Sequence, residues 1–135
     1  MTALRRWMFE RHSNPWSAWT RWASTPLVLL PVWTRRRRDA ALVATWFAAN
    51  PVIFPKPRTD NAWATRAILG EELWATKRPR DAATAVTACT SLAAVGAIVA
   101  SVRRRRVSAA VACACQMAMT LVYWHQMARY WEDHR

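Results

Sequence analysis

The sequence predicts an all-α integral membrane protein, a helical bundle of about four helices arranged as two hairpins with a short interfacial helix between them. Two runs of four arginines, at 35–38 and 103–106, each lie between two apolar stretches. The stretches 82–102 and 107–123, on either side of the second run, contain no charged residue. Their length matches the roughly 20 residues that a helix needs to cross a bilayer. We therefore expect a single helical membrane domain over residues 1–135.

Charge is the second observation behind this prediction. Twenty Lys and Arg against eight Asp and Glu give the 135 residues a formal net charge of +12, and 53% of the residues are hydrophobic. Such a balance fits either nucleic acid or an anionic membrane surface as partner. A nucleic-acid binder usually spreads its basic residues over one face of amphipathic elements. Here the charge is segregated by segment, which favours membrane lipids with anionic headgroups and does not favour nucleic acid.

The first expected hairpin covers 16–54, with the first arginine run at its turn. Asn14 or Ser13 can cap its first helix, with Pro15 at the first helical position, and this helix is expected over 16–33. Asp39 can cap the second helix, which Asn50-Pro51 ends or kinks. Both apolar segments are short for a hydrocarbon core of about 30 Å, so a tilted, kinked or re-entrant path is the alternative to a full crossing.

A separate helix is expected over 61–77. On a helical wheel Trp63, Ala67, Gly70 and Trp74 fall on one side. This pattern favours a helix that lies at the headgroup level with its tryptophans toward the bilayer. A lid or a partner-binding helix is the alternative.

The second hairpin is expected over 82–130, and its turn aligns with the first arginine turn at an offset of 68 residues, from Arg35 to Arg103. Each half then reads helix, arginine turn, helix, with chance similarity as the rival explanation. The positive-inside bias would place both turns in the cytoplasm. We therefore expect a multi-pass protein of the cell membrane.

The remaining chemistry-bearing residues do not identify an enzyme, a metal site or a cofactor. Ten tryptophans lie mostly near the expected segment ends, which is typical of the membrane interface. Cys113 and Cys115 are two residues apart and point in different directions on a helix, so they do not form a metal clamp. With only two glycines, the chain has no phosphate-cradling glycine loop. We expect no cofactor and no metal.

Three motifs are similar to those of a known family. They read HxNPWSxxTR from His12 to Arg21, NPxxFPxP from Asn50 to Pro57, and WxxRxxLGExxW from Trp63 to Trp74. They resemble a family of small prokaryotic multi-pass membrane proteins of unknown function. The resemblance implies a helical membrane protein with a shared polar site. With His12 added from the first motif, the candidate site residues are His12, Asn14, Trp16, Arg21, Asn50, Arg66 and Glu71.

These observations lead to three functional hypotheses. The first is a non-enzymatic accessory or scaffold protein, in a larger membrane complex or self-associated, whose arginine turns contact anionic lipid. The second is a small membrane enzyme or carrier for a lipid or phosphate substrate, and the third is a soluble basic nucleic-acid-binding protein. The expected headgroup contacts of the first hypothesis are Arg35, Arg36, Arg37, Arg38, Arg103, Arg104, Arg105 and Arg106.

Overall fold

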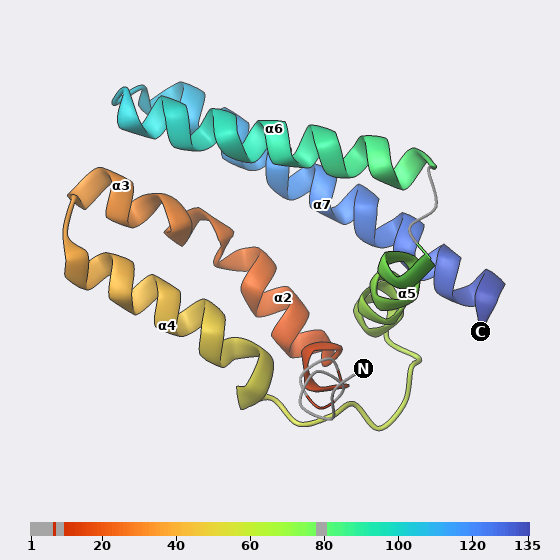
Figure 1. Ribbon diagram of the computed structural model, residues 1–135. Helices are drawn as coiled ribbons and strands as arrows, with labels where there is room; N and C mark the ends of the chain where they lie inside the picture. Colours follow the sequence, from red (N-terminus) through yellow and green to blue (C-terminus); the bar gives the residue numbers. More distant parts are fainter. Residues whose placement is uncertain (1–6, 8–9, 78–80) are drawn as a thin grey trace.

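A computed structural model describes residue 7, residues 10–77 and residues 81–135. Over these residues the chain is helical and contains no strand. Seven labelled elements follow one another (Figure 1). They are α2 (Pro15–Ala23), the 3₁₀ helix η1 (Thr25–Leu29), α3 (Leu30–Thr34), α4 (Arg37–Ile53), α5 (Trp63–Lys77), α6 (Ala82–Val102) and α7 (Arg106–His134).

Prolines divide the helix that was expected over 16–33 into three pieces. Asn14 caps α2 as expected, because its side-chain oxygen accepts a hydrogen bond from the Trp16 backbone N–H at 2.9 Å and Pro15 follows at the first helical position. Pro26 and Pro31 then stand in the first turns of η1 and α3. Proline starts a helix readily but is disfavoured within one, because it lacks the N–H that the helical ladder needs. The first arm of the hairpin is therefore α2, η1 and α3 in succession.

The second arm, α4, begins two residues before the expected cap. Arg36 occupies the N-cap position without a side-chain capping bond, and Asp39 lies in the first turn instead. A carboxylate there still interacts favourably with the positive end of the helix dipole. Pro51 lies inside α4, so the helix continues through it to Ile53. The 17 residues of α4 rise about 26 Å, less than the roughly 30 Å of a hydrocarbon core.

The second hairpin consists of α6 and α7, which pack along each other. In the described part of the chain, these are the two helices that are long and apolar enough to cross a membrane. The structure therefore supports two membrane-capable helices and not the four that the sequence predicts. α6 starts at a side-chain cap that the sequence analysis missed, since Asp81 accepts hydrogen bonds from the backbone N–H groups of Ala83 at 3.0 Å and Thr84 at 3.3 Å.

α5 packs closely against α7. Ala67 and Gly70 are buried, and Trp74 meets Tyr123 of α7 edge to face at a ring distance of 6.2 Å. A Cβ atom on Gly70 would overlap the backbone carbonyl group of Met127. The small residues of this face thus allow a close helix crossing, so the face that was expected to lie toward the bilayer packs on α7 at these positions.

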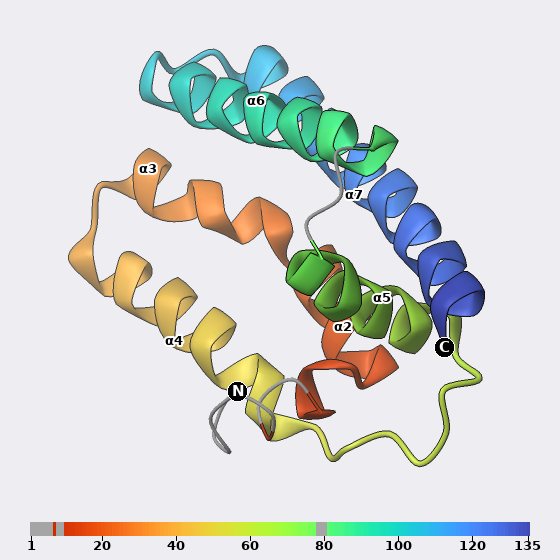
Figure 2. The same ribbon diagram turned by 45° about the vertical axis from the view of Figure 1, so that its right-hand side comes forward.

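Both arginine turns lie at the same end of the molecule, opposite the C-terminus (Figures 1 and 2). Each turn has one arginine in the left-handed backbone region, Arg35 with φ 55° and Arg104 with φ 59°. The equivalent residues are thus 69 positions apart, one more than the sequence alignment gives. Arg104 also joins the hairpins, because its Nη1 donates to the Trp33 carbonyl oxygen at 2.6 Å and its guanidinium lies over the Trp33 ring.

Candidate functional site

A cluster of polar side chains lies where α2, α5 and α7 meet. Arg21 of α2 donates from Nη1 to His12 Nε2 at 2.6 Å and from Nε to the Ser17 carbonyl oxygen at 3.2 Å. Because Arg21 is the donor, His12 Nε2 must be the unprotonated ring nitrogen. On the other side, the Glu71 carboxylate attracts Arg21 and is hydrogen-bonded by the Tyr123 hydroxyl. Three segments far apart in the sequence therefore contribute to one cluster.

Burial sets the protonation behaviour of this cluster. Desolvation, together with the positive charge of Arg21, lowers the pKa of His12 to about 4. Desolvation also lowers the pKa of Arg21 to about 10, against the opposing attraction of Glu71. Burial raises the pKa of Glu71, while Arg21 and the Tyr123 hydroxyl act in the opposite direction. Carrying a charge in this cluster thus costs more free energy than in water, and each hydrogen bond in it is stronger than in water.

One donor of the cluster is left without a partner. Arg21 Nη2 is buried and makes no hydrogen bond to any described residue. A buried guanidinium group normally satisfies its N–H donors with carboxylate, phosphate or carbonyl oxygens. The cluster therefore contains one buried donor that no described oxygen accepts.

A small hollow of about 160 Å³ opens beside Glu71 and Tyr123, between α5, α6 and α7. Its other lining side chains carry hydroxyl groups. Each of these hydroxyls donates to a backbone carbonyl oxygen of its own helix, so only its lone pairs are available to the hollow. The residues concerned are Thr87, Thr90, Ser91 and Thr120.

Four of the ten tryptophans pack beside the cluster. The ring of Trp19 is 5.8 Å from each of the rings of Trp22, Trp63 and Trp124. The Trp22 Nε1 group donates to the Met117 carbonyl oxygen at 3.0 Å. These indoles are thus part of the contact between α2, α5 and α7, whereas their spacing in the sequence favoured the membrane interface.

Asn14 and Asn50 belong to a neighbouring set that fastens α2 to α4. Asn50 is completely buried; its Oδ1 accepts from Ser17 Oγ at 2.9 Å and its Nδ2 donates to Thr20 Oγ1 at 2.9 Å. Asn14 donates from Nδ2 to the Pro55 carbonyl oxygen at 2.9 Å. Ser17 connects the two sets, because its carbonyl oxygen accepts a hydrogen bond from Arg21 and its hydroxyl group donates one to Asn50. Both asparagines therefore have a structural role in this fold.

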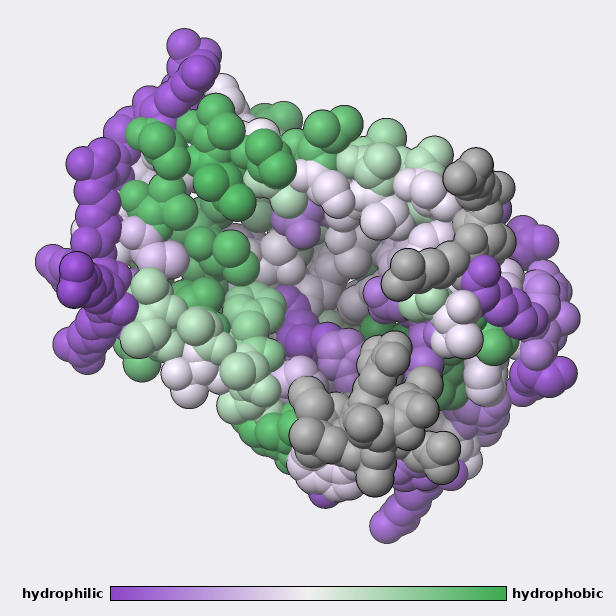
Figure 3. Space-filling model, in the orientation of Figure 1, coloured by the Kyte–Doolittle hydropathy of each residue, from purple (hydrophilic) through white to green (hydrophobic). Residues whose placement is uncertain are grey.

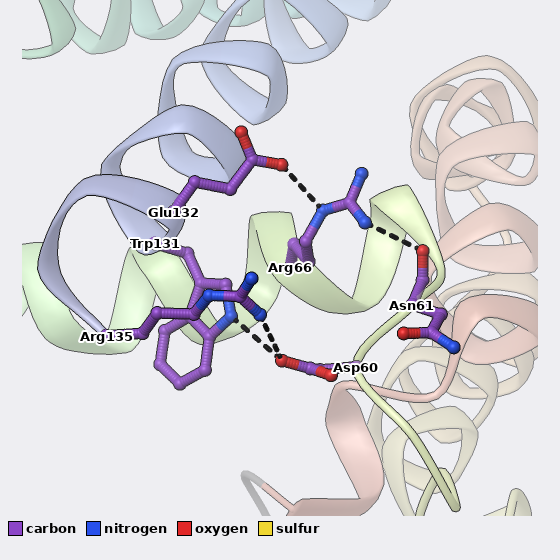
Figure 4. A network of polar contacts seen from close by, with 6 residues as sticks. All are labelled: Asp60, Asn61, Arg66, Trp131, Glu132 and Arg135. Atoms are coloured by element: carbon purple, nitrogen blue, oxygen red, sulfur yellow. Dashed lines mark hydrogen bonds and ion pairs between the residues drawn. The ribbon is translucent and has the colours of Figure 1, made fainter.

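Two further expected site residues lie outside both the cluster and this neighbouring set. The Trp16 side chain points away from the core and is 69% exposed. Arg66 pairs with Glu132 at 3.1 Å and donates to the Asn61 carbonyl oxygen at 2.8 Å (Figure 4). The structure therefore brings together three of the seven residues that the sequence predicts, His12, Arg21 and Glu71. The sequence did not indicate the fourth member of the cluster, Tyr123.

Arg66 is part of a separate network at the end of the molecule that carries the C-terminus (Figure 4). Asp60 accepts hydrogen bonds from Trp131 Nε1 at 3.3 Å and from Arg135 Nη1 at 3.2 Å. The bond from Trp131 is the main reason why the pKa of Asp60 lies below its ordinary value. This network fastens the loop before α5 to the end of α7.

The low pKa of His12 predicts a dependence of stability on pH. As the pH falls below 6.5, the unfolded chain takes up a proton on His12, whereas the folded chain does so only near pH 4. We expect the free energy of unfolding to fall by about 1 kcal/mol between pH 6.5 and 5, as measured by thermal unfolding in detergent. The His12→Gln variant should lose this dependence, while His125→Gln, at an exposed position of α7, should keep it.

The chain was compared with curated proteins, with solved structures and with protein families. No curated protein and no solved structure matches it. Residues 3–134, almost the whole chain, match a family model, and the chain therefore belongs to the family of unknown function DUF6653.

Proposed function

We propose that this protein is an integral membrane protein anchored by the α6–α7 hairpin, and that its role is that of a non-enzymatic accessory or scaffold protein. One observation supports the membrane assignment above all others. In each of these two helices, only 17% of an apolar 18-residue stretch is buried within the fold. Leu92 is 72% exposed, Val95 56% and Val107 78%. A soluble monomer rarely leaves so continuous an apolar surface in water.

The lengths and the charges of the hairpin support the same proposal. The 21 residues of α6 rise about 31 Å, which is the thickness of a hydrocarbon core. Asp81 lies at one end of this helix and the second arginine run at the other. In Figure 3 a row of hydrophilic surface at the end of the arginine turns borders directly on a hydrophobic region. We propose that this end lies among anionic headgroups on the cytoplasmic side.

Cell fractionation tests the proposal. The protein should stay in the membrane pellet after washing with high salt and with alkaline carbonate, and mild detergent should release it. The Leu92→Lys variant places a charge at the middle of α6 and should increase the carbonate-soluble fraction several-fold. The matched variant Val107→Lys, beside the second arginine run, should remain in the pellet. Recovery of the wild-type protein in the high-salt wash would instead favour a soluble basic protein that binds nucleic acid.

The unpartnered Nη2 of Arg21 favours a second candidate function, a small membrane enzyme or carrier that acts on a lipid or phosphate substrate. In detergent, inorganic phosphate or glycerol phosphate should raise the melting temperature of the wild-type protein. Arg21→Gln should lose this response and Arg37→Gln, at an exposed position of the first arginine turn, should keep it. Equal responses of the two variants would show that phosphate binds outside the cluster.

A further inference from the structure

A groove lies between the first hairpin and the start of α7, at the end of the molecule that carries the arginine turns. Its volume is about 520 Å³. η1 and α3 form one wall with leucine and proline side chains and with Trp33, and the first turn of α7 forms the other wall with Ala109 and Ala110. Apart from Arg106, every lining residue is apolar. Such a volume is within the range of grooves that hold small ligands.

Cationic and donor groups gather at one end of the groove only. Arg106 is both a lining residue and the first residue of α7. The N-cap residue Arg105 provides no side-chain capping bond, so the first N–H groups of this 29-residue helix lack a side-chain acceptor there. No carboxylate lines the groove. This end is therefore suited to an anion, and phosphate is the group that arginine and a helix N-terminus bind together.

The rest of the groove is suited to hydrocarbon. Leu27 and Leu30 are 45% and 41% exposed, so this wall offers apolar surface that the fold itself does not cover. One molecule with an anionic phosphate next to an alkyl chain would fit both ends, and a free phosphate ion would leave the apolar wall uncovered.

We propose that the groove binds one anionic phospholipid, with an acyl chain along Leu27, Leu30 and Ala110 and with its phosphate at Arg106 and the N-terminus of α7. The proposal rests on the membrane insertion of the α6–α7 hairpin and deepens it, because it assigns a defined lipid to a defined place. The other arginines of the two turns then act as a general electrostatic attraction to the surface. The groove itself retains a single molecule.

The proposal is tested by native mass spectrometry. The protein is reconstituted into nanodiscs of phosphatidylcholine and phosphatidylglycerol in a ratio of three to one, and the lipids that stay bound on release are counted. The wild-type protein should retain one phosphatidylglycerol. Ala110→Trp fills the groove without changing charge, and Arg106→Gln removes its cation; each should lower retention at least tenfold. Val107→Trp, at an exposed position next to Arg106, and Arg37→Gln, in the other turn, are the matched controls and should retain the lipid.

Each outcome decides between the proposals. An inserted wild-type protein that retains no phosphatidylglycerol, or that retains phosphatidylcholine equally well, overturns the lipid site and leaves the membrane assignment intact. Equal retention by Ala110→Trp and Val107→Trp would place the lipid outside the groove. Displacement of the lipid by millimolar inorganic phosphate would show that the phosphate alone is bound. A protein that does not insert into the nanodiscs would overturn the proposed function itself.

Discussion

Replacing Gly70 by alanine should destabilise the protein by about 3 kcal/mol, the upper end of what an overpacked site costs. The new methyl group would occupy the space of the Met127 backbone carbonyl on α7. A backbone group cannot rotate away as a side chain can, so α5 and α7 would have to separate. Their separation would also disturb the ring contacts of Trp63 and Trp74 with α7. The measurement is the shift of the unfolding midpoint in detergent.

The other glycine of the chain gives a matched control. A Cβ atom on Gly96 would meet only the Ala112 side chain, at 3.9 Å, which is ordinary van der Waals contact. Since alanine is the better helix former, Gly96→Ala should be neutral or should stabilise the protein by about 0.5 kcal/mol. If Gly70→Ala unfolded at the same midpoint as Gly96→Ala, the close crossing of α5 and α7 would be disproved.

The sequence could predict those elements that depend on local chemistry. The uncharged run at 82–102 became α6 with the same bounds, and Asn14-Pro15 began α2 as expected. These predictions succeed because length, charge and capping residues act within a few positions of each other. The expected helix over 16–33 failed because it was drawn through Pro26 and Pro31, each of which starts a new helical piece.

Local sequence patterns could not predict which helix packs on which face of another. The apolar face of α5 is the same whether it rests on lipid or on α7, so only the tertiary packing against Met127 separates the two cases. The sequence could group His12, Arg21 and Glu71 through the motifs, whereas Tyr123 lies at the end of the uncharged run 107–123, 52 residues after Glu71. The phenol of Tyr123 within the uncharged run 107–123 was the one indication in the sequence that α7 contributes to the cluster.

The second large effect concerns the charge of Arg21. In the Glu71→Gln variant the Tyr123 hydroxyl keeps an acceptor, but the buried guanidinium loses its carboxylate. Glu71 acts on Arg21 through its charge and not through a direct ion pair, so we expect a loss of about 2 kcal/mol, less than for a buried salt bridge. The loss is also limited because Arg21 keeps its hydrogen bonds to His12 and Ser17. Glu72→Gln, one residue further along α5, should change the free energy of unfolding by less than about 0.5 kcal/mol.

A double variant separates electrostatics from packing. Arg21→Met alone should destabilise the protein, because it removes two hydrogen bonds and leaves the Glu71 carboxylate without its cation. In the Glu71→Gln background the same change also removes an uncompensated buried charge, so it should cost far less, with a coupling energy of about 2 kcal/mol in the double-mutant cycle. Additive effects of the two substitutions would mean that Arg21 and Glu71 do not sense each other. A coupling of the expected size would instead establish that the attraction between Arg21 and Glu71 stabilises the cluster. An anion that bound at Arg21 Nη2 would have to compete with this attraction.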